Sequence, residues 1–150
     1  MVTESDVQKL LRSSKWLSKG VKQKNLTRHL RSAVKGEDRI LASRAIYVAA
    51  RIKTKACVEI VKEAAFGRIT NLRIAAATVA DELPRKDAVE VLSRLLKSRN
   101  SSIRKKALES AAKLMSQDLL LQLKAIARND PEFKLKRMAK AMVSELSELE

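Results

Sequence analysis

Four regularly spaced alanines constrain the fold of this chain more than any other feature of its sequence. Ala45, Ala76 and Ala107 follow one another at intervals of 31 residues, and Ala139 comes 32 residues later. A fixed period between about 20 and 50 residues is the signature of a protein that stacks one small structural unit. We therefore predict that each alanine is buried at the same position of a repeated unit, where a larger side chain would push neighbouring elements apart.

Each repeated unit has the hydrophobic pattern of two helices. In the third unit, apolar residues recur with a helical period over about residues 85–97 and again over about 102–115. The turn between them contains Ser101 and Ser102, and either serine can cap the second helix. In the fourth unit, Asp130 can cap the second helix and Pro131 then takes its first position. Only three glycines and two prolines occur in 150 residues, which favours long helices over a β-rich fold.

The spacing also predicts how the chain is organised. We expect a single domain, residues 1–150, with helical pairs at residues 25–53, 54–84, 85–116 and 117–148. Residues 1–20 have an amphipathic pattern of their own that ends at Gly20. Because the end units of stacked repeats need a cover, this first helix is predicted to cap the first pair.

The second helix of these units resembles that of HEAT repeats. Leu72–Ala76 and Ile103–Ala107 both have the pattern apolar-Arg-x-x-Ala, whereas the first unit has Ala42 in place of the arginine. The resemblance covers about residues 25–148. It implies an all-α fold, a right-handed α–α solenoid of about four HEAT-like helical pairs with an N-terminal capping helix. In such repeats the arginine often bridges neighbouring units, which is the favoured interpretation of Arg73 and Arg104.

Positive charge dominates the composition. The chain has 32 lysines and arginines against 17 acidic residues, a formal net charge of +15, and residues 1–35 hold nine of the basic residues. Such a charge favours polyanionic partners. We therefore expect a non-enzymatic module that binds a polyanion, most simply the nucleic-acid backbone without sequence specificity. The alternative is a protein–protein interaction scaffold for an acidic partner.

The candidate polyanion-binding residues lie on the first helix, on the linker that follows it and on the second helices of the last two pairs. On the first helix, Trp16 shares a face with basic side chains, so its indole can stack on a base while the cations neutralise phosphates. The alternative is that Trp16 packs under the linker. The complete set is Lys9, Arg12, Trp16, Lys19, Lys22, Lys24, Arg104, Lys105, Lys106, Lys136 and Arg137.

Few groups in the sequence are suited to catalysis. His29 is the only histidine, and Cys57 is the only cysteine, at the position equivalent to Ala88, which predicts a buried thiol. We expect no metal, cofactor or small-molecule substrate. A HEAT-type DNA glycosylase is a minor alternative, because it needs aromatic side chains around an extruded base and those of this chain lie in separate units. They are Trp16, Tyr47, Phe66 and Phe133.

The expected location is cytoplasmic. No run of about 18 apolar residues predicts a transmembrane segment, the first residues lack the pattern of a signal peptide, and a lone cysteine suits a reducing compartment. Association of the first helix with a membrane surface is a third, weaker option.

Overall fold

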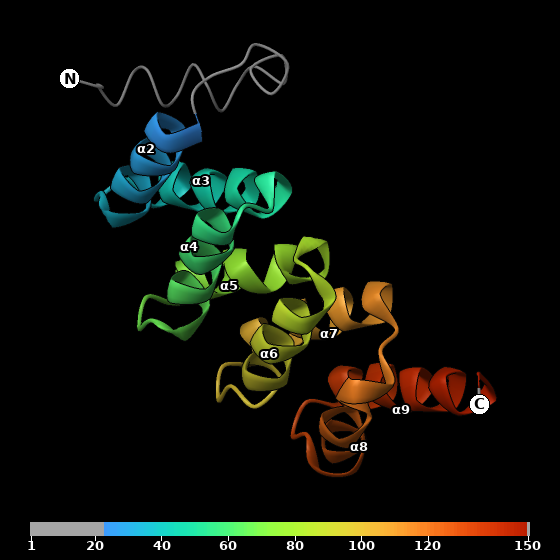
Figure 1. The fold of residues 1–150 in the computed structure, drawn as a ribbon. Helices are drawn as coiled ribbons and strands as arrows, with labels where there is room; N and C mark the ends of the chain where they lie inside the picture. The colour runs from blue at the N-terminus through green and yellow to red at the C-terminus, as the bar shows by residue number, and fades with distance from the viewer. Residues whose placement is uncertain (1–22, 150) are drawn as a thin grey trace. The chain divides into compact units, whose positions relative to one another are not determined.

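A computed structural model describes residues 23–149, with side chains from Leu26 onward, and every regular element in this range is helical (Figure 1). The predicted all-α fold of paired helices is confirmed. None of the helices in the described range is long and apolar enough to cross a bilayer. The elements, in chain order, are α2 (Gln23–Lys35), α3 (Arg39–Ile52), α4 (Lys55–Phe66), α5 (Thr70–Val79), η2 (Ala80–Glu82), α6 (Arg85–Leu95), α7 (Ser101–Leu114), η3 (Gln117–Leu119), α8 (Leu120–Asn129) and α9 (Phe133–Glu148).

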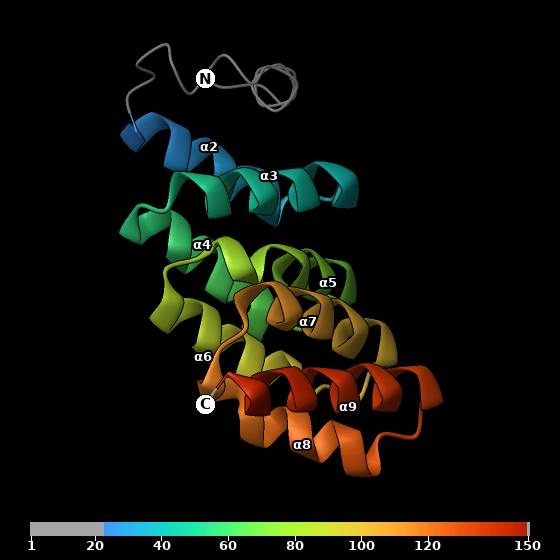
Figure 2. The same cartoon turned by 90° about the vertical axis from the view of Figure 1, so that its right-hand side faces the viewer.

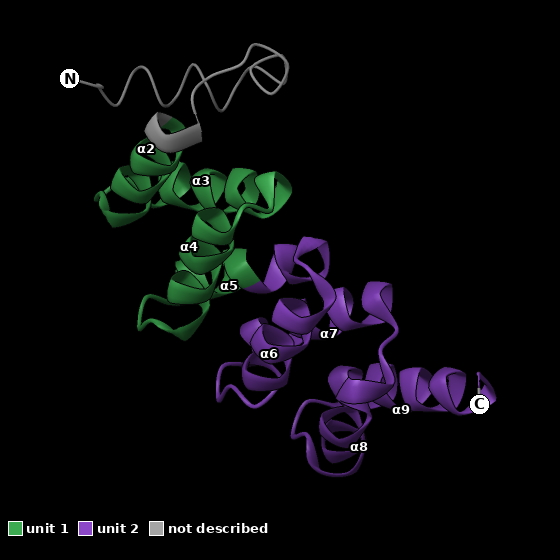
Figure 3. Ribbon diagram, viewed as in Figure 1, with its two compact units in different colours: residues 1–76 green, residues 77–150 purple. Residues whose placement is uncertain are grey.

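The chain divides into two compact units, residues 1–76 and residues 77–150 (Figure 3). In unit 1, α2 packs on α3 and α3 packs on α4. In unit 2, α6 packs on α7, α7 on α9, and α8 lies along α9 (Figure 2). Each predicted pair of helices is present, although α2 begins two residues before the predicted range. The organisation as a single domain remains a prediction.

The repeat alanines have the burial that their spacing predicts. Ala45, Ala76, Ala107 and Ala139 are all 0% exposed, so their register is confirmed. Cys57 is also buried, as its position in the repeat predicts. A small side chain at each of these points lets helix backbones approach closely, which is how a core poor in aromatic residues reaches normal packing density.

Polar side chains link equivalent places in consecutive repeats within each unit. In unit 1, Arg31 Nη1 donates to Glu63 Oε2 at 2.7 Å, across 32 residues of sequence. In unit 2, Arg85 Nη2 donates to Ser116 Oγ at 3.4 Å, across 31 residues. These contacts follow the repeat period, so they tie the first helical pair to the second and the third to the fourth.

Two predicted helix starts differ from the observed ones. Asn100, rather than Ser101 or Ser102, caps α7, because its Oδ1 accepts from the backbone N–H of Ser102 at 2.9 Å. Helix α9 begins at Phe133 and not at the proline, because the Asp130 carboxylate accepts from the N–H of residue 132 at 2.8 Å and also binds an arginine. Both oxygens of Asp130 are therefore occupied before the helix begins.

Candidate functional site

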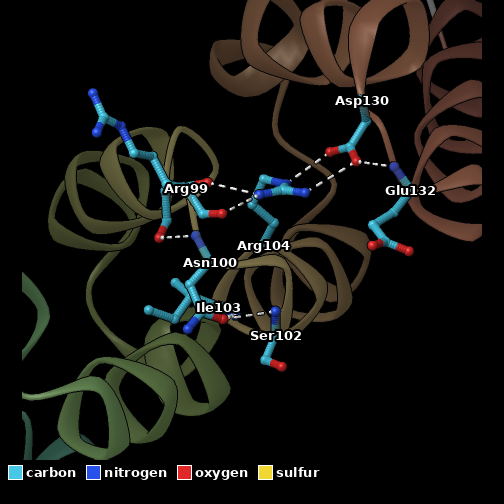
Figure 4. Close-up of polar contacts among 8 residues, drawn as sticks. Arg99, Asn100, Ser102, Ile103, Arg104, Asp130 and Glu132 are labelled. Carbon is cyan, nitrogen blue, oxygen red and sulfur yellow. Dashed lines mark hydrogen bonds and ion pairs between the residues drawn. The ribbon is translucent and has the colours of Figure 1, made fainter.

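Arg104 lies inside unit 2 and holds two loops together (Figure 4). Its Nε donates to Asp130 Oδ2 at 2.8 Å and its Nη2 donates to Oδ1 at 3.1 Å. Its Nη1 donates to the carbonyl oxygens of Ser98 at 3.0 Å and Arg99 at 3.1 Å. With 8% of its surface exposed, Arg104 does not face an external ligand, and its prediction as a polyanion-binding residue is wrong. The bridging interpretation applies to it instead.

The other predicted basic residues of unit 2 lie on α7 and α9. Lys105 and Arg137 occupy equivalent positions on these two helices, and both are exposed. Lys136 is half-buried. Lys106 Nζ lies 3.3 Å from Glu109 Oε2, so its charge is partly balanced within α7. The structure thus keeps these four residues at the surface of two helices that pack on each other.

An exposed aromatic residue lies beside one of them, Arg137, and its place in this site was not predicted from the sequence. Phe133 is 70% exposed, and the guanidinium carbon of Arg137 lies 5.8 Å from the centre of its ring. Lys140 follows one turn after Arg137 and is also exposed. Because Phe133 precedes Arg137 by four residues, helical geometry alone places both on one side of α9. We call this surface the second-helix face, which comprises Lys105, Lys106, Phe133, Lys136, Arg137 and Lys140.

The remaining predicted residues fall outside the described side chains. The N-terminal set lies in residues 1–22, and Lys24 lies in α2 at a position whose side chain is not described. The capping helix and its candidate binding residues therefore remain predictions. They are Lys9, Arg12, Trp16, Lys19 and Lys22.

The potential metal ligands and the aromatic residues of the described range are dispersed. Within residues 23–149, no three or more histidine, cysteine, aspartate and glutamate side chains gather at one place. The aromatic residues Tyr47, Phe66 and Phe133 lie on three different helices, α3, α4 and α9.

Comparisons with known proteins agree on the fold. Residues 69–143, half of the chain, match the HEAT repeats. No curated protein matches the chain. Among solved structures, the chain is similar to human deoxyhypusine hydroxylase in complex with glycerol, with a TM-score of 0.66 and 21% sequence identity. The match covers 83% of this chain and 44% of the hydroxylase chain, so the similarity extends over less than half of that enzyme. At this identity, the likeness shows the fold alone.

The expected function is contradicted by this comparison. We expected a non-enzymatic module because the helical stack carries few groups suited to catalysis. The hydroxylase is an enzyme, so a HEAT-repeat fold is no reason to exclude an enzyme. Neither comparison connects the chain with nucleic acid. The prediction that the chain is not an enzyme, and the prediction of a module for the nucleic-acid backbone, are therefore wrong.

Proposed function

Because the chain belongs to the HEAT-repeat family, we propose that its second unit binds a protein partner through the second-helix face. Helical repeats of this kind use extended surfaces to recognise other macromolecules. The observation that carries the proposal is the exposed ring of Phe133 beside Arg137. The second-helix face combines an aromatic anchor with surrounding cations, and aromatic residues and arginine are enriched at protein interfaces.

The Phe133 ring supplies the apolar contact. Burial of an exposed phenylalanine side chain contributes about 1.5–3 kcal/mol, and aromatic anchors are among the residues that dominate binding energies. The guanidinium of Arg137 lies 5.8 Å from the ring centre, within the range of a cation–π contact. This contact restricts the ring before binding, so less conformational entropy is lost when a partner covers it.

The surrounding cations define the charge of the partner segment. Lys105, Arg137 and Lys140 are all exposed, so each can meet a carboxylate without a large desolvation cost. Exposed ion pairs contribute only about 0.2–1 kcal/mol each. We therefore assign affinity mainly to Phe133, and we assign orientation and the rate of association to the cations. The partner segment is an apolar stretch flanked by aspartate or glutamate.

Selection of peptides on the full chain tests this proposal and requires no assumption about the identity of the partner. A random peptide library is displayed on phage and selected against the immobilised protein. The proposal predicts enriched sequences that combine acidic and apolar residues. Their binding should fall at least about tenfold in the Phe133→Ala variant, because truncation of a central aromatic anchor costs about 2 kcal/mol or more.

A matched control is available on α8. Leu121 is 78% exposed, comparable to Phe133, but it lies on the other helix of the pair. Leu121→Ala should leave binding of the selected peptides unchanged. The proposal fails if Leu121→Ala weakens binding as much as Phe133→Ala does, or if the selected peptides are not acidic.

A further inference from the structure

Unit 1 contains a pocket that none of the functions discussed above uses. Its volume is about 380 Å³, and it lies where α2 and α4 end and α3 and α5 begin. Pockets of about 300–1,000 Å³ are the size that holds small chemical groups. The walls come from two consecutive helical pairs, and the rim carries Lys35, Arg39 and Arg68.

The charge of the pocket is positive because its one acidic lining residue is already paired. Glu63 accepts hydrogen bonds from Arg31 Nη1 at 2.7 Å and 3.0 Å. In contrast, no ion pair or hydrogen bond to another described side chain engages Lys35, Arg39 or Arg68, and all three are exposed. Three cations are therefore free to meet an anionic group at this rim.

Nearby carboxylates do not remove this charge. The Asp38 side chain caps α3, where its Oδ1 accepts from the N–H groups of Ile40 and Leu41 at 3.1 Å each. Glu37 lies in the same turn and is exposed, but it does not line the pocket. The acidic residues around this site thus face the helix start or solvent.

The inner wall of the pocket is aliphatic. Ala64 and Leu72 are buried and line it together with Val34, while Ile69 is 39% exposed at its edge. Cations above an aliphatic wall complement a ligand that has a carboxylate at one end and a hydrocarbon group at the other. Adjacent acidic and aliphatic residues of a peptide provide this combination.

We infer that this pocket binds a peptide segment in which glutamate or aspartate precedes an aliphatic residue. The carboxylate meets Lys35, Arg39 and Arg68, and the aliphatic side chain lies against Ala64 and Leu72. A separate protein supplies this segment, because two copies of a chain with a net charge of +15 repel each other. The inference rests on the pocket of unit 1 and does not depend on the second-helix face.

Nuclear magnetic resonance titration of the full chain tests the inference. The probe is the capped peptide acetyl-Gly-Glu-Leu-Gly-amide, and the readout is the backbone amide shifts of Gly36, Ala64 and Gly67. These amides should move together and saturate. The double variant Arg39→Gln/Arg68→Gln should bind the peptide roughly tenfold more weakly, since two exposed charge contacts are lost. The matched control Arg51→Gln removes an exposed arginine of α3 outside the pocket and should bind as the unaltered protein does.

Changes in the peptide separate the two parts of the inference. Replacement of its glutamate by glutamine should remove the shifts, and replacement of its leucine by glycine should weaken them several-fold. Equal shifts with sodium sulfate alone at the same concentration would overturn the aliphatic part. Shifts that persist in the double variant would overturn the site. Shifts that also appear when unlabelled protein is added to the labelled protein without peptide would overturn it too. Binding of this peptide should be unchanged in Phe133→Ala, and its loss there would place the peptide on unit 2 and overturn the site as well.

Discussion

Removal of the Arg104 guanidinium should destabilise unit 2 severely. The side chains of Arg104 and Asp130 are 10% and 2% exposed, and the Arg104→Met variant keeps the aliphatic stem but leaves the carboxylate buried without its cation. Breaking a buried ion pair from one side costs about 3–5 kcal/mol. For a chain of this size, that loss lowers the melting temperature by roughly 6–20 °C.

Circular dichroism of the helical signal during heating and in urea measures this effect. Lys105→Met, on the next residue of α7, removes an exposed charge and should change stability by no more than about 0.5 kcal/mol. In the double variant Arg104→Met/Asp130→Leu no charge remains buried, so it should recover much of the lost stability. A loss below about 1 kcal/mol in Arg104→Met would refute the buried-pair interpretation.

Three further changes test the helices themselves. Ala107→Leu should destabilise by about 1–3 kcal/mol in urea denaturation, because the buried site has no room for a larger side chain. Asn100→Ala should cost about 0.5–2 kcal/mol in the same assay through loss of the α7 cap, whereas Ser102→Ala should cost little. Lys53 is the C-cap of α3 with a φ of 60°, so Lys53→Gly should raise the melting temperature. Lys55→Gly, at the first position of α4, should not raise it, and equal effects would contradict the left-handed cap.

The repeat register could be predicted from the sequence because it depends on local periodicity. Spacing alone identified Ala45, Ala76, Ala107 and Ala139, and all four are buried. Helix starts were less predictable because several capping residues are adjacent. Asn100 precedes two serines, and only the backbone geometry shows which of the three side chains accepts the first N–H groups.

Contacts between repeats were the hardest to predict. Asp130 has the chemistry of either a helix cap or an ion-pair partner, and the choice depends on the position of Arg104, 26 residues earlier. The sequence did not predict Phe133 as the anchor of the second-helix face. It indicated this residue only as one of four aromatic side chains that would have to surround an extruded base. The pocket of unit 1 could not be seen in the sequence, since its walls come from the ends of separate helices.

A double-mutant cycle across the second-helix face tests the proposed protein binding most directly. Titration calorimetry would compare Arg137→Gln, a glutamate-to-glutamine change in a selected peptide, and both changes together. A contact between the two charges predicts a coupling energy of about 0.5–1 kcal/mol or more. The same cycle with Lys124→Gln, an exposed residue of α8, should give no coupling. Coupling below about 0.3 kcal/mol at Arg137 for every acidic position of the peptide would contradict the proposal.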